Sequence, residues 1–334
     1  MNPEIFSKEQ LAGQRLMVGF DGTQLNAHLK FLIRDLKIGG IILFSQNVEA
    51  PGQLKKLCEA VQEYAAINGQ PPLLIAIDQE GGQVARLKEP FTQFPGNPAM
   101  KDVADAVYFA RTTATQLAEA GINMNLAPVM DVAPEDITSI MTDRSFGQDP
   151  LWVSKLGLTI ISQLQQNNIM AVAKHFPGIG RTVADSHIDL PSCECDMAEL
   201  ESCDLIPFAD SIQHDVAGIM LSHVIYKKID PRWPASLSQR IALKLLRERM
   251  RFSGISMTDD LDMGAIKKHY DIKTVIRQII QADIDMTLIC HQGPNIEIAY
   301  REILKHLRGS SELKATGIES VKRIMAIKEK YLGA

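Results

Sequence analysis

An aspartate and a histidine two positions apart, Asp185 and His187, have the residue types and the spacing of an acid/base pair. If the Asp185 carboxylate accepts a hydrogen bond from one ring nitrogen of His187, it fixes the tautomer and leaves the other nitrogen to exchange protons near neutral pH. The pair falls within residues 174–191, which follow an apolar run and are interrupted by proline and glycine. We therefore expect it on a long loop that begins where a strand ends, although such a pair standing alone is more often a solvated surface feature.

Two further carboxylates, Asp78 and Asp259, come directly after other apolar runs. A carboxylate at the end of a strand can accept hydrogen bonds from the hydroxyl groups of a ligand or act as a nucleophile. Asp260 follows Asp259, and because side chains alternate in direction along a strand, we expect one of the two to point away from the site. Each of these carboxylates is, by itself, also compatible with a structural role in which it binds amides of its own loop.

Eight short apolar runs alternate with amphipathic segments along the chain. Apolar runs that are each followed by a helix are typical of parallel strands covered by helices on both faces of the sheet. Eight such units predict an α/β fold of the (β/α)8 TIM-type barrel, as a single domain over residues 1–334, and an open doubly wound sheet is the alternative. The predicted strands are residues 15–20, 40–44, 73–77, 123–127, 170–174, 218–222, 254–258 and 286–290.

The polar residues at the ends of these runs favour the barrel. Asp78, Lys174, His175, His223 and Asp259 all fall at or just after the end of a predicted strand. In a barrel these ends converge on one face, where active sites are built, whereas in an open sheet they would spread along an edge.

The composition is that of an ordinary globular protein, with 46% hydrophobic and 22% charged residues and a net charge of −5. This balance gives no basic footprint for nucleic acid, and neither a signal-peptide pattern nor a long apolar run is present, so we expect a cytoplasmic chain without membrane contact, as a monomer or a homodimer. The five cysteines, which include Cys193, Cys195 and Cys203, lack the spacing of a zinc site and are expected to be reduced thiols. Residues 311–334 are expected to form an amphipathic helix on the outside of the barrel.

Taken together, the motifs resemble those of glycoside hydrolase family 3, and within it the bacterial single-domain β-N-acetylglucosaminidases of cell-wall recycling. They occur in the family's order over nearly the whole chain. The residues that carry the resemblance are Asp78-Gln79-Glu80-Gly81-Gly82, Arg144-Ser145-Phe146-Gly147, Lys174-His175-Phe176-Pro177-Gly178, Asp185-Ser186-His187 and Thr258-Asp259-Asp260-Leu261.

The resemblance implies a retaining exo-β-glycosidase that acts on a small-molecule carbohydrate without a metal or cofactor, and N-acetylglucosamine is the implied sugar. Asp259 matches the family's nucleophile, which forms a covalent glycosyl-enzyme, and His187, positioned by Asp185, matches the acid/base. The implied substrate-binding residues are Asp78, Arg86, Arg144, Lys174, His175 and His223.

Two positions depart from the family pattern. Ile179 stands where the family usually has a second histidine, and Gln83 stands where related enzymes usually carry an arginine. Neither position is the implied nucleophile or acid/base. The departures therefore concern which substrate is accepted.

A phosphorylase is the alternative within the same family. A glutamate base would repel an incoming phosphate, whereas a neutral imidazole such as that of His187 does not. Inorganic phosphate would then replace water as the acceptor of the sugar from a β-glucoside or a β-N-acetylglucosaminide.

Three functions of other classes are compatible with parts of the same pattern. Lys174 at a strand end would serve a Schiff-base lyase if its amine were neutral. A metal-dependent hydrolase would use His175, His187, His223 and Asp259, whose spacing fits no common zinc motif. A carbohydrate-binding protein without catalysis would keep the sugar-binding residues but would not require Asp259 and His187 together.

Overall fold

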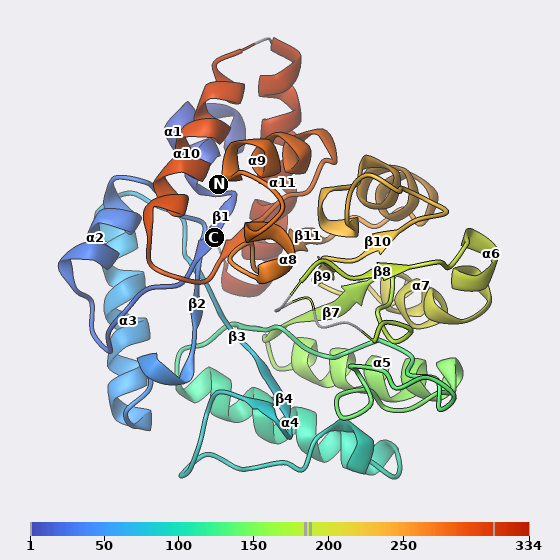
Figure 1. Ribbon diagram of the computed structural model, residues 1–334. Coiled ribbons are helices and arrows are strands. Elements are labelled where there is room, and N and C mark those ends of the chain that lie inside the picture. Colours follow the sequence, from blue (N-terminus) through green and yellow to red (C-terminus); the bar gives the residue numbers. More distant parts are fainter. Residues whose placement is uncertain (1, 184–185, 187–188, 310, 334) are drawn as a thin grey trace.

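The computed structural model describes residues 2–183, 186, 189–309 and 311–333. Eight parallel strands form one sheet, and a parallel bridge between Met257 and Met286 joins its two edge strands, with Thr258 N donating to Met286 O at 3.1 Å. The sheet is therefore closed, and the predicted (β/α)8 barrel is confirmed (Figure 1). In pairing order the strands are β11 (Ile255–Thr258), β9 (Gly218–Leu221), β7 (Met170–Phe176), β6 (Met124–Asn125), β3 (Leu74–Ile77), β2 (Gly40–Leu43), β1 (Leu16–Val18) and β12 (Thr287–Ile289).

Alternate residues of each strand enter two different apolar cores, as the two faces of a strand require. In β1, Met17 belongs to the cluster that fills the barrel interior, whereas Leu16 and Val18 belong to the larger cluster between the strands and the helices. The interior is closed by apolar side chains, many of them methionines, so the barrel has a packed core.

Helices surround the strands in Figure 1. They are α1 (Lys8–Gly13), α2 (Ala27–Arg34), α3 (Pro51–Ile67), α4 (Val103–Glu119), α5 (Pro150–Gln166), α6 (Met197–Glu199), α7 (Ile206–Gln213), α8 (Gly264–Lys267), α9 (Ile272–Gln281) and α10 (Pro294–Leu307), with π-helical turns at Leu200–Asp204 and Gln239–Arg249. Several helices begin at an aspartate that accepts a backbone N–H of the first turn, as Asp102, Asp149 and Asp271 do for α4, α5 and α9. None of the helices in the described residues combines the length and the hydropathy that a membrane crossing would require.

The last helix, α11 (Ser311–Leu332), lies across the end of the barrel where the strands begin. Its Ile324 joins the interior core, and Lys328 Nζ donates to Gln14 Oε1 at 2.7 Å and to Gly39 O, just before β2, at 2.9 Å. We expected this helix on the outside of the barrel. It packs across the strand ends instead, because those ends leave interior apolar side chains that need a cover.

Two short pairs of strands lie outside the barrel sheet. They are the antiparallel pair β4 (Gln79–Gly81) and β5 (Val84–Ala85), and the parallel pair β8 (Ser192–Cys193) and β10 (Ile225–Tyr226). In the second pair, Cys193 is joined to Cys195 by a disulfide, so the expectation that all cysteines are reduced is wrong for these two. The turn after β8 brings their Cα atoms to 5.4 Å, within the range that a disulfide can bridge.

Candidate active site

The carboxyl ends of the barrel strands surround a cavity of about 290 Å³. This is the face at which barrels of this class carry their active sites. Six of the residues predicted from the sequence border the cavity together: Asp78, Arg86, Arg144, Lys174, His175 and Asp259. The strand ends therefore converge on one face of the barrel, as the positions of these residues in the sequence predicted.

A buried cluster of charges forms one wall of the cavity. Lys174 Nζ lies 2.7 Å from Asp78 Oδ1 and 2.6 Å from Glu80 Oε1, and the Lys174 side chain is 3% exposed. Arg144 binds the other side of Glu80 with two parallel contacts, Nη2 to Oε1 at 2.7 Å and Nε to Oε2 at 3.0 Å. Arg144 is therefore held by a buried carboxylate in a bidentate pair.

These contacts fix the charge states of the cluster. Burial would raise the pKa of Asp78, but Lys174 and Arg86 outweigh it and hold that pKa at about 2. Burial would lower the pKa of Lys174, but Asp78 and Glu80 outweigh it and raise that pKa above its usual value. The lysine is therefore a protonated donor at neutral pH, which disfavours the Schiff-base lyase.

The hairpin of β4 and β5 brings Arg86 back to the cavity. Its turn uses Gly81 and Gly82, with φ of 88° and 61°, a conformation that favours glycine. A Cβ on Gly82 would also lie 3.1 Å from Pro95 O, so the turn is packed tightly. As a result Arg86 Nη2 lies 3.3 Å from Asp78 Oδ2.

His175 is oriented by Asp131. The His175 Nδ1 lies 2.8 Å from Asp131 Oδ2, and the other carboxylate oxygen accepts from Ile179 N at 2.8 Å. The register of β7 against β9 shifts between Lys174 and Phe176, so both Lys174 and His175 can border the cavity, although they are adjacent.

Glu80 and Asp131 were not predicted as site residues. Glu80 stands inside the motif that follows β3, and Asp131 follows the apolar residues after β6, so each had the strand-end position that marked the others. Their partners are Lys174 and His175 on β7, far away in sequence. In the sequence, only the position of Glu80 and Asp131 after a strand marked them, and that position does not show which residue each one contacts.

Asp259 lies directly after β11 and borders the cavity. Burial would raise the pKa of Asp259, but the imidazoles of His223 and His175 and the N–H of Asp260, which donates to Asp259 Oδ1 at 2.8 Å, outweigh it and hold the pKa below its usual value. The carboxylate is ionised at neutral pH, which is the state that a nucleophile needs.

Asp259 and Asp260 both border the cavity, whereas we expected one of them to point away. Because β11 ends at Thr258, the strict alternation of a strand does not extend to these two residues. Burial raises the pKa of Asp260 to about 6, despite hydrogen bonds from Asp262 N and Cys290 N. Asp260, Asp262 and His291 form a group of close potential metal ligands in the described part of the chain.

His223 is placed differently from the other predicted residues. It is 1% exposed, and its Nδ1 lies 2.6 Å from Ser236 Oγ and its Nε2 2.9 Å from Asp260 O. Among the described residues, the cavity wall includes the other five predicted substrate-binding residues but not His223. The ring therefore contacts the backbone that carries Asp260, next to Asp259.

The start of the loop after β7 packs closely on the barrel. At Gly180 a Cβ would lie 1.7 Å from Val132 O, so only glycine fits there. Ile179 and Gln83 border a second cavity of about 310 Å³, which shares Arg144, His175 and Asp259 with the first. The predicted acid/base pair, Asp185 and His187, lies outside the described residues.

Comparison with known proteins gives one consistent result. Residues 8–327 match the family model described as the glycosyl hydrolase family 3 N terminal domain. A β-hexosaminidase of Pseudomonas aeruginosa (strain LESB58) is 33% identical over 288 residues, which are 85% of this chain and 84% of that protein.

Solved structures agree with this match. A glycoside hydrolase family 3 β-N-acetylglucosaminidase from Paenibacillus sp. str. FPU-7 superposes with a TM-score of 0.93 at 34% identity. The match covers 98% of this chain and 63% of that longer chain. A β-N-acetylhexosaminidase from Beutenbergia cavernae DSM 12333 superposes with a TM-score of 0.88 at 28% identity, over 97% of this chain and 98% of that one.

Proposed function

The chain belongs to glycosyl hydrolase family 3, and from this premise we propose that it is a retaining exo-β-glycosidase that releases terminal β-linked N-acetylglucosamine. The observation that carries the proposal is Asp259. Its carboxylate is ionised, borders the cavity and lies beside Lys174 and His175. The similar proteins named β-hexosaminidase and β-N-acetylglucosaminidase support the choice of sugar.

Asp259 is the proposed nucleophile. It attacks the anomeric carbon from the β11 side of the cavity, and the bond to the leaving oxygen breaks as the carbon–Asp259 bond forms. The adjacent imidazoles and the Asp260 N–H keep the carboxylate ionised between turnovers. Water then attacks the same carbon and releases Asp259, so the configuration is retained after two inversions.

The charge cluster is the proposed sugar-binding wall. Asp78 offers carboxylate oxygens to sugar hydroxyls, and Lys174, Arg86 and Arg144 offer N–H donors around the same cavity. Because their partners hold each of these side chains in place, little rotamer entropy is lost when the sugar binds.

His187, positioned by Asp185, is the proposed acid/base, and this assignment rests on the family motif. It protonates the leaving oxygen in the first step and accepts a proton from water in the second. The loop position expected from the sequence suits this role, because a loop can close over the bound sugar and exclude bulk water.

The proposal is tested with 4-nitrophenyl β-N-acetylglucosaminide and the matching β-glucoside. We expect the N-acetylglucosaminide to be the better substrate and Asp259→Ala to lower its kcat/KM by on the order of 10³-fold or more. The exposed Asp136→Ala is the matched control and should behave as the wild type. Intact mass after a rapid acid quench should show a chain carrying one sugar, and Asp259→Ala should lack it. An Asp259→Ala protein with full activity would refute the assignment.

The acceptor is tested in the same assay with and without millimolar phosphate. In the described residues Lys174, Arg144 and Arg181 are each paired with a carboxylate, which weakens their attraction for an anion and favours water over phosphate. We expect free sugar at an unchanged rate. Faster turnover with accumulation of an α-sugar 1-phosphate would identify a phosphorylase instead.

A further inference from the structure

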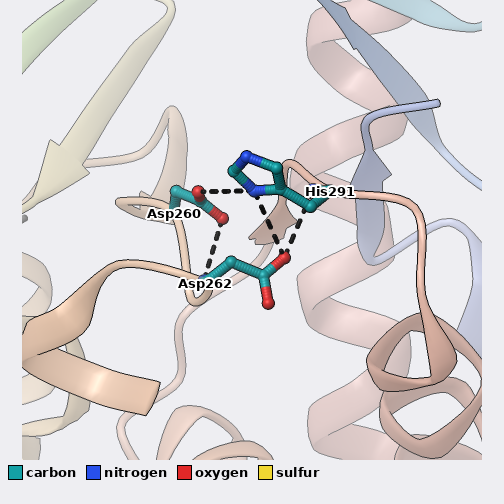
Figure 2. Close-up of side chains that lie close together, drawn as sticks. All are labelled: Asp260, Asp262 and His291. Atoms are coloured by element: carbon teal, nitrogen blue, oxygen red, sulfur yellow. Dashed lines mark hydrogen bonds and ion pairs between the residues drawn. The ribbon is translucent and has the colours of Figure 1, made fainter. Parts of the chain in front are cut away.

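Asp260, Asp262 and His291 converge at the edge of the cavity, where the segments after β11 and β12 meet (Figure 2). His291 Nδ1 lies 3.7 Å from Asp260 Oδ2 and 3.7 Å from Asp262 Oδ2. Both distances are too long for a hydrogen bond. The ring therefore faces two carboxylate oxygens without bonding to either.

The two carboxylates carry negative charge that lacks a strong counterion. In the described residues, neither Asp260 nor Asp262 forms an ion pair with a lysine or an arginine, and His291 is the partner of both. The neighbouring carboxylates Asp78 and Glu80, by contrast, are held by Lys174 and by arginines. The Asp260 and Asp262 side chains are only 14% and 7% exposed, so water compensates their charge incompletely.

The remaining contacts hold the carboxylates in place and leave one oxygen directed at the ring. Asp260 Oδ1 accepts from Asp262 N at 3.0 Å and from Cys290 N at 2.9 Å, which leaves Oδ2 toward His291. Asp262 Oδ1 accepts from Asn295 Nδ2 at 3.1 Å, and its Oδ2 accepts from His291 N at 3.2 Å. These hydrogen bonds orient the two carboxylates before any ligand arrives.

The two separations between His291 Nδ1 and the carboxylate oxygens are close to those of a metal shell, and one ligand atom from each of the three residues lies within 4.8 Å of the others. With bonds of about 2.0–2.1 Å in a tetrahedral zinc site, neighbouring ligand atoms are roughly 3.3–3.4 Å apart. The 3.7 Å separations need to shrink by only a few tenths of an ångström. The His291 side chain is 74% exposed and can make this movement.

We propose that Asp260 Oδ2, Asp262 Oδ2 and His291 Nδ1 bind one zinc ion at the cavity wall, with the fourth position open to water or a ligand. One imidazole and two carboxylates suit zinc better than magnesium or calcium, which prefer oxygen ligands alone. The ion is not a cofactor of the reaction. The ion inhibits the reaction, and this inhibitory role rests on the proposed function of Asp259.

Inhibition follows from the position of the site. Asp260 and His291 border the same cavity as Asp259, and Asp260 is the next residue in the chain. A dication there attracts electron density from the Asp259 carboxylate, weakens it as a nucleophile and holds water where the sugar would enter. Zinc should therefore slow turnover without being required for it.

Zinc binding is measured first, without substrate, by isothermal titration calorimetry of ZnCl2 into the metal-stripped full chain. We expect one zinc per chain in the wild type, and at least a tenfold loss of affinity in His291→Ala. His214→Ala, which removes another exposed histidine, is the matched control and should bind as the wild type. MgCl2 should give no binding.

Two results would overturn the site. One is a wild type that binds no zinc at micromolar concentration. The other is a His291→Ala protein that still binds one zinc with unchanged affinity, since the ion would then lie elsewhere. Asp262→Asn is a second variant with the same expected loss, and circular dichroism shows whether it has folded.

The inhibitory role is tested separately. Zinc should slow the wild type, a chelator should restore its rate, and the ratio of rates with and without zinc should approach one in His291→Ala. If zinc binds through His291 but leaves the rate of turnover unchanged, the inhibitory role is wrong and the proposed binding site stands. Because calorimetry needs no turnover, failure of the glycosidase proposal would leave the binding result intact.

Discussion

At the scale of single residues, the candidate site depends on a buried cluster of charged side chains that share their ion-pair partners. Lys174 is shared by two carboxylates, and Glu80 is shared by two cations. A change at one member therefore leaves its partners buried and uncompensated, which costs more than the lost contact itself. This makes Glu80 a positioning residue for the proposed sugar-binding wall.

Glu80→Gln should weaken substrate binding and lower the free energy of unfolding by about 3 kcal/mol. The amide keeps the shape of Glu80 but removes the charge between Lys174 and Arg144, which are 3% and 17% exposed in their side chains. Urea unfolding and the separate effects on KM and kcat would check this. The exposed Glu135→Gln is the matched control, and a Glu80→Gln protein as stable as that control would contradict the expectation.

At the scale of elements, strands were predicted more completely than helices. All eight strands appear where apolar runs were found, because a strand covered on both faces must be apolar throughout. Apart from the one over residues 311–334, helices were expected only as the amphipathic segments that alternate with these runs, without bounds, although α10 buries Ile296, Ile303 and Leu307 at helical spacing. This helix begins at Pro294, after Gly293 and a short segment that follows β12, and this glycine and proline read as a loop in the sequence.

A second buried charge network holds β11, and with it Asp259, from the opposite end of the barrel. Asp285 is fully buried, contacts Arg247, accepts from Ser256 N on β11 at 2.9 Å and from Arg323 Nε on α11 at 2.8 Å. It therefore joins a strand, a π-helical segment and the last helix. All three share the same carboxylate.

Asp285→Ala should lower the free energy of unfolding by about 3–5 kcal/mol, because it leaves Arg247 buried without its counterion and Arg323 with Asp283 alone. The neighbouring Asp283→Ala should cost clearly less, since Asp283 contacts Arg323 alone and is 18% exposed in its side chain. Chemical unfolding of both variants gives the comparison. Equal losses would mean that the network does not centre on Asp285.

At the scale of the whole molecule, α11 covers the end of the barrel opposite the candidate site. It buries Lys328, whose amine has Gln14 Oε1 and Gly39 O as acceptors among the described residues. Burial lowers the pKa of Lys328 to about 7 from its usual 10.5. The folded chain therefore releases this proton more readily than the unfolded chain does.

Lys328 should make stability depend on pH in the alkaline range. Between about pH 7 and pH 10.5 the unfolded chain holds a proton that the folded chain has lost, so the free energy of unfolding should rise with pH across that window. Below pH 7 both states are protonated and the full cost of the buried charge is present. Lys328→Met should flatten the rise, whereas Lys330→Met on the exposed side of α11 should keep it. Urea unfolding across the window measures both slopes, and a wild type without the rise would contradict the shifted pKa.

The sequence by itself determined the barrel and the strand-end positions of the candidate site. Apolar runs and their spacing are local properties, and the closure of eight such units brings Asp78, Lys174 and Asp259 to one face. The resemblance to the family was likewise carried by short motifs that can be read without a fold, and the family match over residues 8–327 agrees with it.

Only the tertiary structure decided which charges pair and what covers the barrel. Lys174 and Asp78 are 96 positions apart, and the choice of Glu80 as the partner of both Lys174 and Arg144 depends on the register of strands around the closed sheet. The same holds for His291 facing Asp260 and Asp262, and for α11 closing the end of the barrel. Periodicity reports which side of its own element a residue occupies, whereas a partner is selected by distances between elements, and these exist only once the chain has packed.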